Sequence, residues 1–293
     1  MKTNKIIILL FITFFYSMTL NADNIKSNDI PAIVSLDWYK NNKNNSNLVI
    51  IDLRSEEEYK KSHIKNAVNI VPLKSLFNDK FLMPKLDFLK ELFSNAGIDS
   101  NSLVLAYDNG AFIWSARFYW ILETLGHKNV GILKNGYNSW LESQIEISKT
   151  AYQAKRKEFI PRIDNSKVET KLGTLLSIGN KTIIDGRKTS HFEGKQSKAK
   201  RYGHIPTAQN YACTQNYQVT SNGNEMKSFD ELKNLYKDIP KDKEIILYCD
   251  GGAEAALNYV VLNELGYKVA VYDGSWLEWG NDLEVPVENP SNK

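Results

Sequence analysis

Short apolar runs alternate with longer, partly polar segments along most of this 293-residue chain. The runs at 103–107 and 245–248 are rich in Val, Ile, Leu and Tyr, and they are short enough to be buried strands of a parallel sheet. The segment 253–265 has the length of a helix and stops at Gly266, a residue typical of helix C-termini. This alternation predicts an α/β fold, a mainly parallel sheet with helices on both faces.

The whole pattern occurs twice in the chain. Ile-Asp-Leu-Arg at 51–54 matches Ile-Asp-Gly-Arg at 184–187, and the apolar run 103–108 matches 244–249. Further matches keep the same order, pairing His63 with His204, Asn69 with Asn210, Gly126 with Gly266, Tyr137 with Trp276 and Trp140 with Trp279. An ordered set of matches of this length indicates an internal repeat of one structural unit.

We therefore predict two α/β domains of similar size. The N-terminal domain is expected at 23–147 and the C-terminal domain at 162–293, since a repeat of this length has the usual size of a domain. Between them, 148–161 carries the basic triplet 155–157 and shows no apolar periodicity, which is typical of a surface linker.

The first residues have the pattern of a signal peptide, predicted here at 1–22. Lys2 and Lys5 precede an apolar run at 6–20, and Ala22 supplies the small residue of a cleavage site. The run is shorter than the roughly 20 residues that span a bilayer as a helix, so a retained anchor is the less favoured alternative. We expect an exported protein, periplasmic or secreted, with no stable membrane anchor after cleavage.

The net charge of the chain limits the classes of molecule that the protein is expected to bind. The formal net charge is +3, and it falls to +1 when Lys2 and Lys5 are removed with the signal peptide. A nearly neutral protein lacks the basic surface that nucleic-acid binding needs, and we interpret the basic run 195–201 as a solvated loop. We expect small-molecule substrates, no nucleic-acid partner and a monomer.

Cys249 is the main candidate for chemistry. It follows the strand 245–248 and precedes a glycine-containing turn that opens the helix at Ala253. Backbone N–H groups and the positive end of the helix dipole surround a thiol in such a place, and both favour its thiolate. Two alternatives stay open: Cys249 is a buried structural cysteine, or it forms a disulfide with Cys213, which spacing alone does not exclude.

Four motifs carry a resemblance to a known family: Asp185-Gly186-Arg187, Gly203-His204-Ile205-Pro206, Tyr248-Cys249, and Tyr-Asp-Gly-Ser-Trp-Leu-Glu-Trp at 272–279. Together they resemble the tandem-domain rhodaneses, which include thiosulfate sulfurtransferase and 3-mercaptopyruvate sulfurtransferase. The resemblance covers nearly all of the chain after the signal peptide. It implies two rhodanese-like domains, of which the first is inactive, because Asp108 stands where the second domain has Cys249.

The resemblance implies a sulfurtransferase that works in two steps. Cys249 would take sulfane sulfur from a donor such as thiosulfate, 3-mercaptopyruvate or another persulfide source, and pass it to a thiol or to cyanide. The substrate-binding residues would be Arg187, His191, Asp250, Gly251, Gly252, Ala253 and Glu254. The chemistry needs no metal or organic cofactor, and the four histidines show no metal-ligand spacing, with His63 and His204 interpreted as structural.

The catalytic loop departs from its relatives. Those resembled here read Cys-Arg-Lys-Gly-Val-Thr or Cys-Gly-Ser-Gly-Val-Thr, whereas this chain has Asp250 and Glu254 in a loop without cations or hydroxyls, and His191 where the relatives have a substrate-binding arginine. A nearby carboxylate raises the pKa of a thiol and repels an anionic donor, which favours a neutral or cationic persulfide. The simpler interpretation of Glu254 is that it lies in the first helical turn and points to solvent.

The sequence disfavours one other class of function and leaves a second open. A phosphatase on this scaffold needs an arginine six residues after the cysteine, and here that position is Ala255. A non-enzymatic rhodanese-like module, serving as a sulfur carrier or binding protein, is compatible with the altered loop and remains the alternative.

Overall fold

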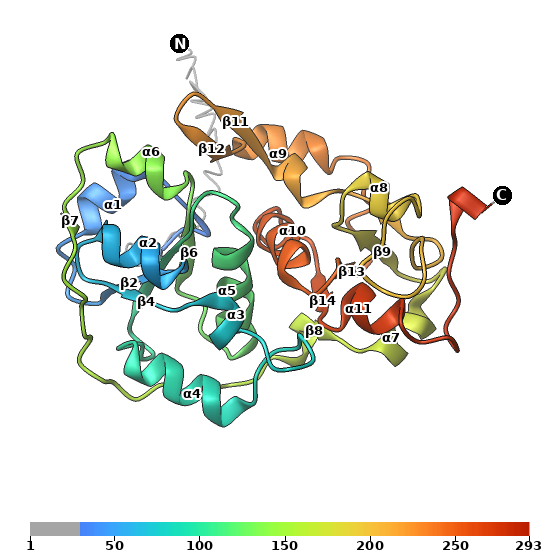
Figure 1. Cartoon of the computed structure of the whole chain (residues 1–293), viewed down its shortest axis with the longest axis horizontal. Helices are drawn as coiled ribbons and strands as arrows, with labels where there is room; N and C mark the ends of the chain where they lie inside the picture. Colours follow the sequence, from blue (N-terminus) through green and yellow to red (C-terminus); the bar gives the residue numbers. More distant parts are fainter. Residues whose placement is uncertain (1–29, 293) are drawn as a thin grey trace, which may run out of the picture.

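The computed structural model describes residues 30–292, and it contains two similar units (Figure 1). The predicted signal peptide at 1–22 lies outside the described residues. In Figure 1 the N-terminal unit runs from blue to green, and the C-terminal unit from yellow to red. None of the helices in the described part of the chain combines the length and the apolar character of a membrane span.

The N-terminal unit is built on a five-stranded sheet in the order β1-β6-β5-β2-β4, with every strand pair parallel. Its strands are β1 (Ile33–Val34), β2 (Leu48–Asp52), β4 (Ala67–Asn69), β5 (Leu103–Tyr107) and β6 (Val130–Leu133). Its helices are α1 (Leu36–Asn42), α2 (Glu56–Lys61), α3 (Pro72–Ser75), α4 (Leu86–Asn95), α5 (Ile113–Thr124) and α6 (Tyr137–Leu141). A short antiparallel pair joins β3 (His63–Ile64) to β7 (Ile147–Ser148).

The C-terminal unit repeats this topology. Its sheet has the order β10-β9-β13-β14-β8, again with parallel pairs only. The strands are β8 (Val168–Glu169), β9 (Thr182–Asp185), β10 (Gln209–Asn210), β13 (Ile245–Tyr248) and β14 (Val269–Tyr272). The helices are α7 (Lys171–Ser177), α8 (Thr189–Phe192), α9 (Phe229–Leu235), α10 (Ala253–Glu264) and α11 (Ser275–Trp279), and a hairpin forms from β11 (Tyr217–Thr220) and β12 (Gly223–Met226).

Helices cover both faces of each sheet, which the alternation of side chains shows. In β5, Val104 and Ala106 belong to the large central core, whereas Leu105 and Tyr107 belong to a separate outer core. Residues of α4, α5, α9 and α10 fill the central core, while α1, α2 and α6, or α7, α8 and α11, cover the outer faces. The predicted α/β fold with two mainly parallel sheets is confirmed.

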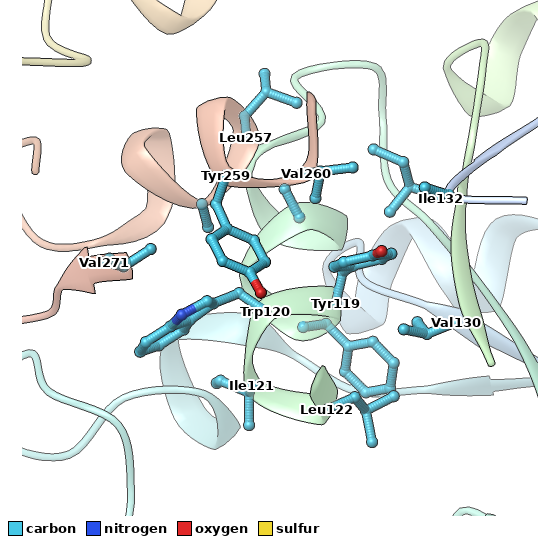
Figure 2. Packing of buried hydrophobic residues seen from close by; sticks show 14 of the residues in the cluster. Tyr119, Trp120, Ile121, Leu122, Val130, Ile132, Leu257, Tyr259, Val260 and Val271 are labelled. Carbon is cyan, nitrogen blue, oxygen red and sulfur yellow. The ribbon is translucent and has the colours of Figure 1, made fainter. Parts of the chain in front are cut away.

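The two units share one core, and their contact is centred on α5 and α10, which lie side by side in Figure 1. Figure 2 shows Tyr119 and Trp120 of α5 packed beside Tyr259 and Val260 of α10, all fully or almost fully buried. The Tyr259 hydroxyl donates to Glu123 across the interface at 2.7 Å. Because these side chains lose their water contacts only when the units are together, the units are expected to fold as one cooperative body.

The connection between the units packs against the first one. Residues 151–164 have no helix or strand, yet Phe159 is buried and lies edge-on to Phe93 at 5.2 Å between ring centroids. The Arg162 N–H donates to the Leu125 carbonyl at 2.8 Å. Residues 159–162 are therefore held against the first unit by packing and hydrogen bonding. The exact bounds of the two domains and of the linker stay predictions.

The repeated histidines have matching structural surroundings. His63 hydrogen-bonds the Tyr59 carbonyl and stacks on that ring at 3.7 Å. His204 does the same with Phe192, at 3.8 Å between ring centroids. Each ring is thus held by a backbone carbonyl and an aromatic or phenolic ring of the helix before it, which agrees with a structural role. Among residues 30–292, no group of three or more potential metal ligands occurs.

Candidate active site

A strand and a helix place Cys249 in a tight loop. β13 ends at Tyr248 and α10 begins at Ala253, so four residues must turn the chain between them. Gly252 makes the turn possible, because its φ of 81° is in the left-handed region. A side chain there would also meet Arg117 Nη1 at 2.6 Å, so glycine is needed for space as well as for conformation.

Residues of the 272–279 motif hydrogen-bond to the backbone of this loop. Ser275 Oγ accepts the Cys249 N–H at 3.1 Å, and the Cys249 carbonyl accepts the Trp276 N–H at 2.9 Å. The Asp250 carbonyl accepts from Leu277 N–H at 2.9 Å. The motif that carries most of the family resemblance therefore acts by fixing the backbone of the cysteine loop.

The sulfur of Cys249 is almost completely buried, with the residue 1% exposed. The Gly252 N–H donates to Sγ at 3.1 Å, so the loop supplies the backbone donor expected from the sequence. Burial, followed by the charge of Glu254, nevertheless raises the Cys249 pKa to about 12, and backbone N–H groups of the loop only partly offset this. Burial and the carboxylates therefore outweigh the backbone donors and the helix N-terminus, which favour the thiolate, and the rise expected from the nearby carboxylates is present.

Cys249 borders a cavity of about 470 Å³ formed by both units. The C-terminal unit contributes the cysteine loop with Lys198 and Leu277. The N-terminal unit contributes an apolar and largely aromatic wall made of Leu73, Phe77, Phe81, Ile113 and Trp114. The first unit thus encloses the sulfur without supplying a nucleophile.

The Asp250 carboxylate is paired with basic side chains, so it does more than repel an anionic substrate. Its Oδ2 atom lies 2.9 Å from Lys198 Nζ, and its Oδ1 atom lies 3.7 Å from His191 Nδ1. Lys198 lies in the run 195–201, and its side chain is 63% exposed, as expected of a solvated loop, yet it also lines the cavity. His191 contacts Asp250 and is not among the residues that line the cavity, so any effect on the substrate would act through Asp250.

Glu254 does not point to solvent. It lines the cavity, and its Oε2 atom is buried with no hydrogen-bond partner among the described residues. Burial, followed by the charge of Asp250, raises the Glu254 pKa to about 7, although Lys198 opposes the shift. The simpler interpretation of this residue is therefore wrong, and the carboxyl group belongs to the site.

Arg187 does not reach the cavity, which corrects its assignment to substrate binding. The guanidinium is buried, makes a two-pronged pair with Asp185 and donates to the Gly203 carbonyl at 2.8 Å. It also stacks on Trp276, 4.4 Å from the ring centroid. Arg54 and Asp52 form the same pair in the first unit, so the repeated Asp-x-Arg motif ties loops to the sheet.

Both cysteines are free thiols in the structure. Cys213 begins the short helix η2 (Cys213–Asn216) and is buried in the central core. Burial, with Glu254 and Cys249 as further causes, raises the Cys213 pKa well above its usual value. Of the two thiols, only that of Cys249 borders the cavity.

The equivalent loop of the first unit is closed by its own carboxylate. Asp108 Oδ1 accepts the N–H groups of Gly110 and Phe112 at 2.8 and 3.0 Å. Asp108 Oδ2 accepts the N–H groups of Trp114 and Ser115, both at 3.2 Å. The donors that would stabilise an anionic sulfur are therefore already occupied by Asp108, and the loop carries no thiol of its own.

Sequence reasoning missed Lys198 and the apolar wall from the first unit. Two of the wall residues are unusually exposed for their size: Leu73 is 61% exposed and Phe81 is 50% exposed. They lie in a segment that carries no catalytic or binding motif. Such exposed apolar side chains indicate a binding surface only when the position of the cavity is known. The structure places the first domain across the cavity from the cysteine loop.

The fold and site define a two-unit α/β protein with one cysteine loop and one closed loop, and comparisons with known proteins agree. The rhodanese-like domain family matches residues 35–143 and 169–282. The thiosulfate sulfurtransferase of Corynebacterium glutamicum is 30% identical, over 89% of this chain and 91% of the relative. The 3-mercaptopyruvate sulfurtransferase of Escherichia coli K12 is 28% identical, over 87% of this chain and 97% of the relative.

Solved structures show the same likeness. The crystal structure of SseA from Escherichia coli, a 3-mercaptopyruvate sulfotransferase, superposes with a TM-score of 0.73 at 26% identity, covering 84% of this chain and 99% of SseA. The anaerobic ergothioneine biosynthesis enzyme of Chlorobium limicola shares the fold, with a TM-score of 0.76 at 21% identity, covering 89% of this chain and 70% of that one. The chain belongs to the rhodanese-like family. Within it, the chain is an enzyme of the sulfurtransferase class, and the non-enzymatic alternative is set aside.

Proposed function

We propose that this protein moves one sulfane sulfur atom from a small-molecule donor to a thiol or to cyanide by way of a persulfide on Cys249. In the first half-reaction the Cys249 sulfur attacks the outer sulfur of the donor. A new S–S bond forms at Cys249, and the donor's own bond breaks with its electron pair left on the departing group. In the second half-reaction the acceptor attacks the terminal sulfur and regenerates the cysteine.

The observation that carries this proposal is the position of Sγ. It is the cysteine sulfur of the described chain that borders the inter-unit cavity, and it lies within 3.1 Å of the Gly252 N–H. A persulfide sulfur extending from Sγ into the cavity would remain close to the donors of the loop. The names of the relatives support the same reaction class.

The surroundings of Sγ favour a donor that is not a small dianion. Among the residues lining the cavity, Asp250 and Glu254 are acidic and Lys198 is basic, while the opposite wall is apolar. Lys198 is held by Asp250, so it offers little free positive charge to an anion. We propose an organic persulfide as the preferred donor, with thiosulfate and 3-mercaptopyruvate as weaker alternatives.

A donor panel tests the proposal. Thiosulfate, 3-mercaptopyruvate and glutathione persulfide would each be mixed with cyanide or with a small thiol, and product formation would be followed for the wild type and for Cys249→Ser. We expect turnover by the wild type, fastest with glutathione persulfide, and none by the variant. Wild-type protein that is inactive with every donor, or a serine variant that retains activity, would rule out the proposal.

We also propose that the mature protein is exported, on the strength of the apolar run at 6–20, and that it acts as a monomer. N-terminal sequencing of the protein recovered from the periplasmic fraction or the medium tests the first point, with Asp23 expected as the first residue. Light scattering tests the second. An uncleaved cytosolic protein, or a dimer, would contradict the respective part.

A further inference from the structure

The mechanism leaves one proton without an assigned acceptor. Burial, together with Glu254 and Asp250, keeps Cys249 protonated, because its pKa is about 12. A thiol is a far weaker nucleophile than a thiolate, so the proton must leave as the sulfur attacks. A group beside the sulfur must be able to take it.

Glu254 has the position and the bonding for that task. It is the second residue of α10, it borders the same cavity as Cys249, and its charge is the second largest influence on the Cys249 pKa after burial. Its Oε2 atom is buried with no hydrogen-bond partner among the described residues. A buried carboxylate oxygen without a donor is costly in a structure that serves stability alone, which points to a use in the reaction.

The other acidic residue of the cavity is less suited. Asp250 Oδ1 is also buried with no hydrogen-bond partner among the described residues, but Asp250 Oδ2 lies 2.9 Å from Lys198 Nζ, so protonating this carboxylate would break an ion pair. The groups that act on Glu254 come from every side of the site: Cys249 and Asp250 from its own loop, Lys198 from the 195–201 segment, Asp185 and Arg187 from the end of β9, Cys213 from η2 and Tyr217 from β11. Burial, with the balance of these charges, raises the Glu254 pKa to about 7, where a carboxyl can both take and give a proton.

We propose that Glu254 is the proton shuttle of the first half-reaction, taking the proton of the Cys249 thiol and giving it to the leaving thiolate of the donor. This rests on the proposed function, since it names the donor class of the same site: persulfides of the form R–S–SH, whose departing group is a thiolate. Thiosulfate releases sulfite, which departs as a stable anion and has less need of a proton.

The step balances in atoms and charge. The thiol proton moves to the Glu254 carboxylate, and the resulting Cys249 thiolate attacks the outer sulfur of R–S–SH. The S–S bond of the donor breaks with its electron pair on R–S⁻, which then takes the proton from Glu254. The products are a Cys249 persulfide and R–SH, with Glu254 returned to its carboxylate and no oxidant or reductant consumed.

The arrangement also explains how a carboxylate can lie beside a nucleophilic sulfur. While the proton is on Glu254, that side chain is neutral and no longer repels the thiolate, so the pair carries a single negative charge. The two groups therefore titrate as a unit. Below a pH of about 7 both are protonated and the pair is unreactive.

Glu254→Gln tests the proposal, because the amide keeps the shape and cannot exchange the proton. Glu264→Gln is the matched control, since Glu264 is an exposed residue at the other end of the same helix. The rates to compare are kcat/KM for glutathione persulfide and for thiosulfate, from well below to well above pH 7. The wild type and the control should show activity rising with pH through about 7.

In Glu254→Gln that rise should disappear, and kcat/KM for glutathione persulfide above pH 7 should fall by ~10²-fold, within the range usual for a lost acid–base group. The ratio of glutathione persulfide to thiosulfate activity should fall by at least about tenfold, since only the first donor needs the returned proton. Glu254→Asp, which keeps a carboxyl group, should retain the rise with pH. A Gln variant with the wild-type pH profile and donor ratio would overturn the proposal.

Alkylation of Cys249 by iodoacetamide separates this inference from the proposed function, since it requires no sulfur donor. The alkylation rate should rise through a pH of about 7 in the wild type, and only at higher pH in Glu254→Gln. Wild-type protein that shows this rise but forms no persulfide would defeat the proposed function, while Glu254 would stand as the base that takes the Cys249 proton. Identical alkylation profiles in the two proteins would defeat the shuttle.

Discussion

The loops that follow β5 and β13 have the same position in the repeat, and they differ in what occupies them. In the first unit, the Asp108 carboxylate accepts hydrogen bonds from four backbone N–H groups of its own loop. In the second unit, Cys249 Sγ occupies the loop and borders an open cavity. A loop rich in N–H groups is therefore not an active site by itself. It becomes one when its donors are left for a ligand and when a path leads to them.

The surroundings of the two loops differ as well. The β11–β12 hairpin of the second unit lies against the first loop, where Asn224 Nδ2 donates to the Gly110 carbonyl at 2.8 Å and the Asn224 carbonyl accepts from Gly136 N–H at 3.2 Å. The second loop instead faces the aromatic wall of the first unit across the cavity. Each unit thus covers the loop of the other, and of the residues Asp108 and Cys249 only Cys249 borders the inter-unit cavity.

The largest effect is expected at the nucleophile. Cys249→Ser should abolish sulfur transfer without unfolding the protein, because oxygen cannot form the persulfide and the side chains are nearly the same size. Cys213→Ser is the matched control, since that thiol lies in the core and away from the cavity, and it should retain activity. Activity assays and circular dichroism on both variants provide the check. Loss of activity only in Cys213→Ser would reverse the assignment.

The second largest effect is expected where the units join beneath the cysteine loop. Arg117 of α5 is fully buried and pairs with Asp273 at 2.5 Å, next to Gly252. Arg117→Ala leaves the Asp273 charge without its partner, so we expect a loss of about 3 to 5 kcal/mol in the free energy of unfolding, together with reduced turnover.

Denaturant unfolding measures that loss. Arg156→Ala is the control, because the Arg156–Glu91 pair is exposed on both sides and should contribute less than about 1 kcal/mol. Equal losses in the two variants would show that the buried pair does not hold the loop and the units together.

A third effect separates stability from catalysis in the closed loop. Asp108→Ala leaves several buried N–H groups without an acceptor, so stability should fall by on the order of 3 kcal/mol while turnover stays within a few-fold of the parent. Thermal unfolding and an activity assay below the unfolding temperature measure the two quantities. If Asp108→Ala loses its turnover but keeps its fold, the first loop has a catalytic role, contrary to the difference between the two loops described above.

Much of this comparison could be predicted from the sequence, because its causes are local. Short motifs and the internal repeat were enough to predict three features: the strand 245–248, the helix that ends before Gly266, and the presence of Asp108 where the second unit has Cys249. The sequence did not reveal how far burial raises the Cys249 pKa, nor that Lys198 reaches Asp250. Both depend on segments that meet only in the folded chain, and no periodicity or spacing encodes such meetings. Arg187 was misassigned for the same reason, since its stacking on Trp276 is a tertiary contact.

The smallest effect concerns Asp250, the first acidic residue of the cysteine loop. Asp250→Asn removes a negative charge near Sγ and frees Lys198, so kcat/KM for thiosulfate should rise by about tenfold, less at high salt because Lys198 is 63% exposed. Adding Lys198→Met to that variant should cancel most of the gain. A thiosulfate rate that is unchanged in Asp250→Asn would show that charge at this position does not select the donor.

The most direct test of the whole account is to give both loops a thiol and see which one takes sulfur. The Asp108→Cys variant would be treated with glutathione persulfide, digested, and mapped by mass spectrometry for peptides heavier by one sulfur atom. Because only the second loop opens into the cavity, the account predicts the added sulfur on Cys249, with position 108 and Cys213 unmodified. Sulfur on Cys213 would contradict the choice of nucleophile, and sulfur at position 108 would show that access to the cavity is not what separates the two loops.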